Sequence, residues 1–289
     1  MYKKRKIKFI IIGILAVAVF LVWSAYFSSQ PNDKMKVYFF DVGQGDAAMI
    51  ETPNRNQILI DGGPDNSILS KLGRVMPFYD RTIELVILTH PDSDHLAGLV
   101  EVMKNYEIGA ILTNGRDCAS AICQEFSRIV KQKNIKTITA DIGQKIDFGS
   151  GVKMDILLPA KPSLTKVADG KSEDNNLSII SRLAYGADSF LFTGDAEAKE
   201  EMELISACPD LKAEVLKVAH HGSKNSTSEL FLDKVRPKFS IISSGAKNRY
   251  GHPKPETLEK LKKIGAEILR TDLWGDIKLE SEGKGVVTR

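Results

Sequence analysis

The sequence predicts an α+β protein in which two packed sheets are flanked by helices, behind one N-terminal transmembrane helix. Three observations lead to this class. Short apolar or alternating runs, typical of strands, far outnumber helical patterns. Most of these runs end in a polar residue that could serve a functional site. No repeat, low-complexity block or interior linker divides the chain, and 289 residues with 43% apolar composition can bury one large core.

The N-terminal residues have the pattern of a membrane anchor followed by a linker. Five basic residues precede residues 9–27, which carry no charge over 19 positions, and about 20 apolar residues span a bilayer core. A cleavable signal peptide has a shorter apolar core, of roughly 7 to 15 residues, and small residues at its cleavage site. The sequence SAYF at 24–27 lacks that pattern. We therefore predict a retained signal anchor at 1–29, a linker at 30–35 and one domain at 36–289.

The basic cluster before the apolar span also predicts orientation. Lys and Arg beside a membrane span stay in the cytoplasm, so the domain should lie outside a bacterial cell, attached to its membrane by a single pass. Without that cluster, 35 Lys and Arg remain against 37 Asp and Glu. Such a balance argues against nucleic-acid binding through overall charge and leaves only local basic patches.

Strands and helices are assigned from the spacing of apolar residues and from the glycines and polar residues that end each run. Runs of Val, Ile, Leu and Phe bounded by glycine, such as those before GQGD at 43–46 and before Gly62, are typical of strands. The expected strands are residues 35–41, 47–51, 57–60, 83–88, 110–113, 135–139, 145–148, 153–158, 177–185, 189–193, 215–219, 239–243, 267–271 and 276–280. Apolar residues at helical spacing predict helices at 66–79, after residue 95, at 119–131, 197–205 and 255–264.

One strand-to-helix corner, THPDSDHLAGL at 89–99, concentrates potential metal ligands. Four lie within six positions: His90, Asp92, Asp94 and His95. Alternate residues of an extended segment point the same way, and His95 in the first helical turn can turn back toward them. One corner can therefore serve two neighbouring ions. These residues also have structural alternatives to metal binding. Asp94 could cap the helix, and a single histidine could be a hydrogen-bonded structural residue.

The motif HPDSDH resembles the HxHxDH signature of the metallo-β-lactamase fold, with Asp92 in place of the middle histidine. Four further motifs follow the order of one branch of that family: DVGQGDA at 41–47, LIDGG at 59–63, FTGD at 192–195 and HHGS at 220–223. Together they are similar to the hydrolase-like domain of the ComEC/Rec2 competence proteins and their free-standing relatives, from about residue 36 onward. The resemblance implies a four-layer αββα sandwich.

The resemblance also implies two divalent metal ions and a ligand set. The expected ligands are His90, Asp92, Asp94, His95, Asp195 and His220. The first two would bind one ion, the next two with His220 would bind the other, and Asp195 would bridge them. Asp94 would also orient the attacking water, and Asp61 would support the ligands from behind. A plain turn aspartate is the alternative for Asp61.

One departure from the family pattern affects the first ion. Metallo-β-lactamase-like hydrolases usually carry another metal-binding histidine before the bridging aspartate, and no histidine occurs here between residues 95 and 220. Asn176 and Ser178 lie in that stretch and could line the pocket, but amides and hydroxyls are weak ligands. The first ion should therefore be held loosely. With Asp92 as well, the donors are rich in oxygen, so Mn²⁺ competes with Zn²⁺.

Several polar residues remain as candidates for substrate contact. His221 and His252 could contact substrate or act as a general acid, and structural hydrogen bonding is the alternative for both. A phosphate could be held by Lys247, Arg249 and Tyr250, although a solvated charged loop would look the same. Asp46 is expected at the pocket rim. No CxxC pair predicts a thiolate zinc site, and Cys118 and Cys123 could form a disulfide outside the cell, with Cys208 left free.

The function that follows is an exported, membrane-anchored metal-dependent hydrolase. The resemblance to competence proteins favours phosphodiesters as substrates. It implies a nuclease that acts on DNA during DNA uptake. One alternative is a cell-wall phosphodiester or phosphorylcholine esterase. Another is a surface binding domain that keeps the site without turnover. Other catalytic patterns are missing, since the sequence has no GxSxG and no GxGxxG after a strand.

Overall fold

A computed structural model of the chain describes residues 2–28, 33–116, 118–159, 178–208 and 210–289. Asn176, one of the predicted pocket residues, lies outside these ranges. The α-helices are α1 (Tyr2–Ser28), α2 (Ser67–Val75), α3 (Ser93–Asn105), α4 (Ala121–Gln132), α5 (Ala198–Ala207), α6 (Glu229–Val235), α7 (Pro255–Lys263) and α8 (Thr271–Trp274). A short 3₁₀ turn, η2, covers Ala219–Gly222.

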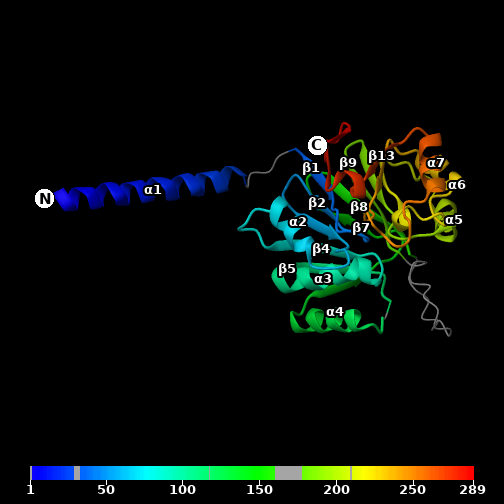
Figure 1. The fold of residues 1–289 in the computed structure, drawn as a ribbon, viewed down its shortest axis with the longest axis horizontal. Coiled ribbons are helices and arrows are strands. Elements are labelled where there is room, and N and C mark those ends of the chain that lie inside the picture. Colours follow the sequence, from blue (N-terminus) through cyan, green and yellow to red (C-terminus); the bar gives the residue numbers. More distant parts are fainter. Residues whose placement is uncertain (1, 29–32, 117, 160–177, 209) are drawn as a thin grey trace.

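The strands form two mixed sheets that pack face to face (Figure 1). The first sheet has the order β15-β14-β1-β2-β3-β4-β5-β6, and the second has the order β13-β12-β11-β10-β9-β8-β7. The strands of the first are β1 (Met35–Phe39), β2 (Ala48–Glu51), β3 (Gln57–Ile60), β4 (Thr82–Leu88), β5 (Glu107–Thr113), β6 (Lys136–Thr139), β14 (Ile277–Ser281) and β15 (Val286–Thr288). Those of the second are β7 (Lys145–Asp147), β8 (Val152–Leu158), β9 (Ile180–Tyr185), β10 (Asp188–Phe192), β11 (Val215–Lys217), β12 (Phe239–Ile242) and β13 (Glu267–Arg270).

Three apolar cores hold the four layers together. The central core lies between the sheets, where the rings of Phe39 and Phe192 stack with centroids 5.9 Å apart. A second core packs α2, α3 and α4 on the first sheet, and a third packs α5, α6 and α7 on the second. Fully burying one such side chain stabilises the fold by roughly 1.5–3 kcal/mol. The three cores together therefore hold two sheets and two helical layers in place as an αββα sandwich. The predicted fold class is confirmed.

Most of the predicted elements are present, within about three residues at each end. The sequence reading missed η2, α6, α8 and β15, which have three to seven residues each. Elements this short offer too few positions for an apolar period to show. The proposed Cys118–Cys123 disulfide is present at the start of α4, and Cys208 is a free, half-buried thiol.

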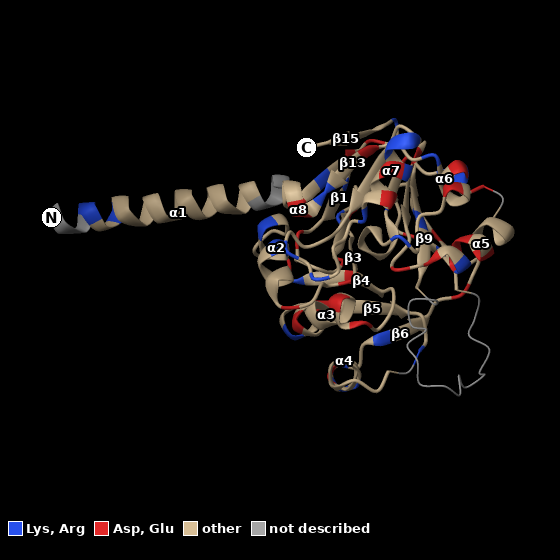
Figure 2. Ribbon diagram, turned by 45° about the vertical axis from the view of Figure 1, so that its right-hand side comes forward, with Lys and Arg blue, Asp and Glu red and all other residues tan. Residues whose placement is uncertain are grey.

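The helix α1 extends away from the sandwich and is exposed along the part whose side chains are described. Its residues Arg5–Ser24 are long and apolar enough to cross a membrane by length and composition, and a signal sequence would pass the same test. Figure 2 shows Lys and Arg only near the N-terminal end of this helix, followed by a long uncharged stretch.

Candidate metal centre

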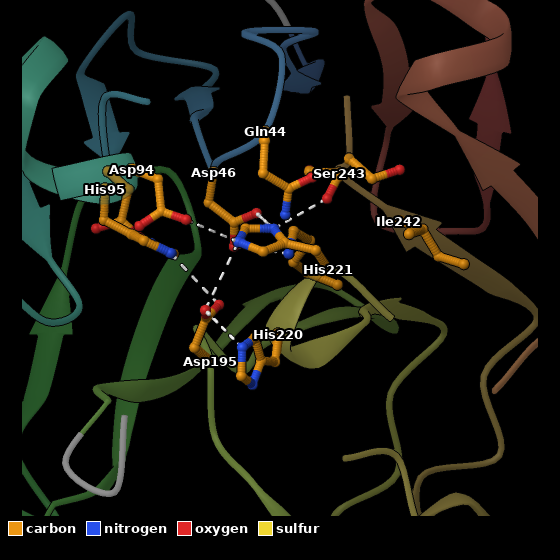
Figure 3. Close-up of polar contacts among 12 residues, drawn as sticks. Gln44, Asp46, Asp94, His95, Asp195, His220, His221, Ile242 and Ser243 are labelled. Atoms are coloured by element: carbon orange, nitrogen blue, oxygen red, sulfur yellow. Dashed lines mark hydrogen bonds and ion pairs between the residues drawn. The ribbon is translucent and has the colours of Figure 1, made fainter. Parts of the chain in front are cut away.

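The candidate site lies where strands of both sheets end. The chain leaves β3 into Asp61, β4 into the His90 corner, β10 into Asp195 and β11 into the HHGS turn. Because these strands run the same way within each sheet, their carboxyl ends meet at one edge of the sandwich. Figure 3 shows the labelled side chains of three of these segments, Asp94 with His95, Asp195, and His220 with His221, gathered in one place.

His95 is held by a buried carboxylate. Its Nδ1 lies 2.8 Å from Asp61 Oδ2, and Asp61 in turn accepts hydrogen bonds from the Thr89 hydroxyl at 2.7 Å and the Thr89 amide at 2.9 Å. A carboxylate behind an imidazole fixes the ring and leaves the other nitrogen free for a metal. Here the other nitrogen, Nε2, faces Asp195 Oδ1 at 3.4 Å. Asp61 therefore lies where the supporting residue was expected.

Two glycines allow α3 to approach this carboxylate. The Gly62 amide donates to the His95 carbonyl at 2.8 Å, and the Gly98 amide donates to the Gly63 carbonyl at 2.9 Å. A Cβ atom on Gly98 would overlap the Gly62 carbonyl, and one on Gly62 would meet the backbone of Leu99. Only glycine permits this contact between helix and turn, which sets the distance between Asp61 and His95.

His221 is the second imidazole with carboxylate support. Its Nδ1 lies 3.0 Å from the Ser243 carbonyl and 3.2 Å from Asp46 Oδ1. Its Nε2 points to Asp94 Oδ2 at 3.4 Å and Asp195 Oδ2 at 3.6 Å (Figure 3). His221 thus shares a potential ion site with Asp94 and His95.

His220, the neighbour chosen from sequence, lies at the edge of the cluster. Its Nε2 is 3.9 Å from Asp195 Oδ2, and its Nδ1 is 3.4 Å from Glu197 Oε1. It belongs to none of the ion-sized groups of three ligands found among the described residues. The geometry therefore favours His221 as the ligand from the HHGS motif.

The backbone of the HHGS turn explains the exchange of these two histidines. His220 and His221 have φ of 49° and 53°, and Gly222 has φ of 82°. Three consecutive left-handed residues turn the chain sharply after Val218, so this turn and not a strand sets the directions of the two imidazoles. A left-handed residue other than glycine costs of order 1–3 kcal/mol, and such strain is concentrated at functional sites.

Asp46 lies at the centre of the site and not at its rim. It is 5% exposed, and one of its oxygens accepts a hydrogen bond from Lys217 Nζ at 2.6 Å. Lys217 is also buried and donates to the Val218 carbonyl at 3.0 Å. Sequence reasoning missed Lys217; its only signal was a charge inside the apolar run that leads to the HHGS motif. A buried charge is tolerated only when it is paired, and this pair ties the two sheets together beside His221.

His90 has weaker support than the other two imidazoles. Its Nε2 lies 3.7 Å from Asp92 Oδ2 and 4.0 Å from Asp195 Oδ2. Its Nδ1 is approached by hydroxyls, those of Thr89 at 3.0 Å and Ser178 at 3.5 Å. Ser178 also accepts a hydrogen bond from the Asp195 amide at 3.1 Å, so it lies beside the ligands His90 and Asp195. The Asp92 side chain is 41% exposed, whereas those of the other cluster ligands are more deeply buried.

A chain of rings leads from this cluster toward the surface. The His220 and His252 rings are 5.7 Å apart, and the His252 ring stacks on Tyr250 at 5.8 Å. Arg249 lies over the Tyr250 ring at 4.9 Å and donates to its hydroxyl at 2.7 Å. The hydrogen bond to Tyr250, with a smaller effect of the Asp94 charge, raises the pKa of the Arg249 guanidinium. Lys247 is exposed on the same loop.

The electrostatics divide the histidines into two kinds. Burial lowers the pKa of His221, but Asp195 and Asp46 outweigh burial and raise that pKa to about 10. The pKa of His95 is likewise raised, because Asp195 and Asp61 outweigh its burial. Burial, reinforced by His95, instead lowers the pKa of His90 to about 3. Burial and the charge of His220 lower the pKa of His252 to about 4, so His252 is neutral at pH 7.

The buried atoms at the centre fit divalent metal ions. His90 Nε2, His95 Nε2, His221 Nε2 and Asp195 Oδ1 are all buried without a hydrogen-bond partner in the described part of the chain. Leaving one such atom unsatisfied costs about 1–3 kcal/mol, so four converging on one place require an explanation. Ion-sized groups are formed by His90, His95 and Asp195, and by Asp94, His95 and His221. Imidazole and carboxylate donors suit Zn²⁺ and Mn²⁺, and a cation would satisfy all four atoms.

Solved structures share this fold. The structure is similar to the metallo-beta-lactamase fold protein YhfI from Bacillus subtilis, with a TM-score of 0.56, 14% identity and coverage of 86% of this chain and all of the other. Zn²⁺-bound PqqB from Methylobacterium extorquens has a TM-score of 0.52 and 10% identity, over 81% of this chain and 97% of the other. At these identities the likeness concerns the fold alone.

Sequence relatives are competence and recombination proteins. ComE operon protein 3 of Bacillus subtilis is 28% identical over 92% of this chain, and recombination protein 2 of Haemophilus influenzae is 32% identical over 88% of it. This chain spans only 35% and 30% of the length of those two relatives. The family model described as the beta-lactamase superfamily domain matches residues 56–215. The chain therefore belongs to the metallo-β-lactamase superfamily, as a metal-dependent hydrolase fold related to the competence proteins.

Proposed function

We propose that this protein is a membrane-anchored, exported phosphodiesterase that uses two divalent metal ions, Zn²⁺ or Mn²⁺, to cleave nucleic acid. The observation that carries the proposal is the convergence of three buried imidazoles and the carboxylate of Asp195, each with an unsatisfied inward atom. The relationship to proteins of competence and recombination supports nucleic acid as the substrate class. The N-terminal apolar helix supports a single-pass anchor with the domain outside the cell.

In this proposal the ligands form two sets that share Asp195. Asp94, His95 and His221 hold one ion, and His90 and Asp92 hold the other. When bound, the ions lower the pKa of water and stabilise negative charge on a phosphoryl group. The chain orients these ligands through the carboxylates of Asp61 and Asp46, and it excludes water from all but the outer side of the cluster.

The groups on the outer side suit an anionic, aromatic substrate. Arg249 brings a permanent positive charge close to Asp94, and Tyr250 presents a ring that is 48% exposed. A guanidinium binds phosphate oxygens, and an exposed ring gives a base a surface for stacking. His252, neutral at pH 7, can accept a hydrogen bond or a proton from the substrate side.

The test is turnover by the purified full chain, stripped of metal and then supplied with Zn²⁺ or Mn²⁺. Single-stranded DNA and a chromogenic phosphodiester should be cleaved, and a β-lactam and a thioester should not. Asp94→Asn keeps the shape of the site and should remove activity, whereas Asp65→Asn, at a position outside the cluster, should leave it unchanged. Preference for the β-lactam or the thioester would contradict the proposal. Preference for a phosphorylcholine ester would favour a wall esterase, and bound metal without any turnover would favour a binding domain.

A further inference from the structure

The point where the chain enters the domain is well defined. The carbonyl of Asp33 accepts a hydrogen bond from Tyr185 Oη at 2.9 Å, and Lys34 pairs with Glu282 at 3.3 Å. Residue 35 then begins β1. Seven peptide steps separate Ser28, the end of α1, from Met35, so an extended chain can place them at most about 25 Å apart.

This point lies at the end of the sandwich opposite the metal cluster. β1 runs from Met35 toward the loop that carries Asp46, and β3 and β4 run in the same direction toward Asp61 and His90. The seven residues of β4 alone span about 23 Å. A bilayer that holds α1 therefore meets the amino ends of β1, β3 and β4, while the metal cluster opens at the far end.

An exposed aromatic pair lies on this same end. Phe78 and Tyr79 occupy the loop between α2 and β4 and are 87% and 47% exposed. Their rings meet edge to face with centroids 5.3 Å apart. In Figures 1 and 2 this part of the domain, beside α2, lies on the side that α1 approaches. Phe78 is the most exposed large apolar side chain among the described residues of the domain.

The loop is fixed to the edge where the chain enters. Asp80, directly after the aromatic pair, accepts a hydrogen bond from Gln57 Nε2 at 2.6 Å, and Gln57 stands opposite Glu51 in the next strand. Glu51 is in turn paired with Lys36 of β1 at 2.9 Å. β1 and β4 are three strand spacings apart, or about 14 Å, which is well within the reach of the linker.

We propose that Phe78 and Tyr79 insert into the interfacial layer of the bilayer that holds α1, and so seat the domain with its metal cluster facing away from the membrane. This inference rests on the proposed anchor. Aromatic side chains favour the headgroup region, where an apolar ring and a polar tip are both satisfied. The short tether keeps the loop at a high local concentration beside the lipid. One aromatic loop is therefore sufficient to orient the domain, even if the loop alone would not bind free vesicles.

Charge plays little part in the proposed contact. The same edge carries Lys36 and Arg81 along with Glu51 and Glu84, so both signs alternate around the aromatic pair. Insertion should therefore occur on zwitterionic lipid and change little with salt, unlike binding through a basic patch.

The chain offers a matched pair of fluorescent reporters. It has two tryptophans, Trp23 in α1 and Trp274 in α8, and Trp274 is 65% exposed at the end that holds the metal cluster. One variant, Trp23→Phe, keeps Trp274 as the sole tryptophan. A second adds Trp274→Phe and Phe78→Trp. Both full chains are reconstituted in phosphatidylcholine vesicles that contain a brominated lipid, which quenches tryptophan only on contact.

The Phe78→Trp reporter should be quenched several-fold more strongly than Trp274, with a blue-shifted emission. Equal quenching of both, or stronger quenching of Trp274, in chains that remain in the vesicles after an alkaline wash would overturn the seating and leave the anchor intact. Loss of the chain from the vesicles in that wash would overturn the anchor and the seating together.

Discussion

The metal cluster has two halves, one around His95 and His221 and one around His90, and they differ in the groups that support their imidazoles from behind. His95 and His221 each have a buried carboxylate behind the ring, Asp61 for one and Asp46 for the other. Among the residues that the structure describes, His90 has only hydroxyls behind it, and its partner Asp92 is 41% exposed. Because a supporting carboxylate fixes the ring and strengthens the ligand, the first half should bind its ion tightly and the second half loosely. In the proposed arrangement, support from behind the ligands therefore distinguishes two ion sites that would share Asp195.

The largest effect should come from removing what the two halves share. Asp195→Ala deletes the one carboxylate in the described part of the chain that faces His90, His95 and His221 together, so both ions should be lost and the difference between the halves with them. We expect metal-dependent turnover to fall by at least 10³-fold, or about 4 kcal/mol of barrier. Metal content by mass spectrometry and turnover measure this, with far-ultraviolet circular dichroism to confirm the fold. Near-normal activity with stoichiometric metal would refute the shared-ligand arrangement.

A backbone change can damage the supported half from a distance. Gly98→Ala should destabilise the fold by about 1–3 kcal/mol, because the added methyl overlaps the Gly62 carbonyl and pushes α3 and His95 away from Asp61. Gly73→Ala is the matched control, since Gly73 is helical and has open space around it. That control should stabilise the fold by roughly 0.5–1 kcal/mol. Urea unfolding reports both values, and equal effects from the two variants would mean that the close contact is unimportant.

Removing the group behind one imidazole at a time should show that the two halves differ in metal affinity. Asp61→Asn should lower the affinity of the tight site by about 10–100-fold, the usual effect of losing a carboxylate behind a metal-binding imidazole. Ser178→Ala, which removes a hydroxyl near His90, should change the affinity of the loose site much less. Titration calorimetry with Zn²⁺ resolves the two sites. If Ser178→Ala proved as damaging as Asp61→Asn, the contrast between the halves would be wrong.

Proton release gives the smallest but most selective signal. With a pKa of about 10, His221 is protonated at pH 7 without metal, and a metal can bind only after that proton leaves. Binding to the tight site should therefore release protons at pH 7, and its affinity should rise with pH up to about 10. His90, with a pKa of about 3, is already neutral and should release none. Calorimetry in buffers of different ionisation enthalpy counts the protons, and a count of zero at the tight site would contradict this prediction.

Local patterns in the sequence predicted the corner from His90 to His95, because a strand, four ligands and a helix follow one another within a few residues. Asp61 and Asp195 were assigned through the resemblance, although each stands directly after an apolar strand. The pair of Asp46 and Lys217 was not predictable in this way. Its members are 171 residues apart in sequence and meet only when the two sheets pack.

The choice between His220 and His221 depended on backbone geometry that residue types do not reveal. The resemblance implied His220, whereas three consecutive left-handed residues turn the chain so that His221 faces the cluster. The short helix α6 was missed for a related reason. Its seven residues acquire their apolar face from packing on the second sheet and show no repeating pattern of their own.

The pairing of β1 with β14 has a consequence for how the protein is made. Met35, near the start of the domain, lies opposite Ser281, near its end, so the first sheet is completed only when the last strands are available. Closing so long a loop makes folding slow and leaves β1 with a bare edge until then. In the proposed export, the domain would cross the membrane with that edge unpaired, and its protection from proteases would depend on the arrival of the C-terminal strands.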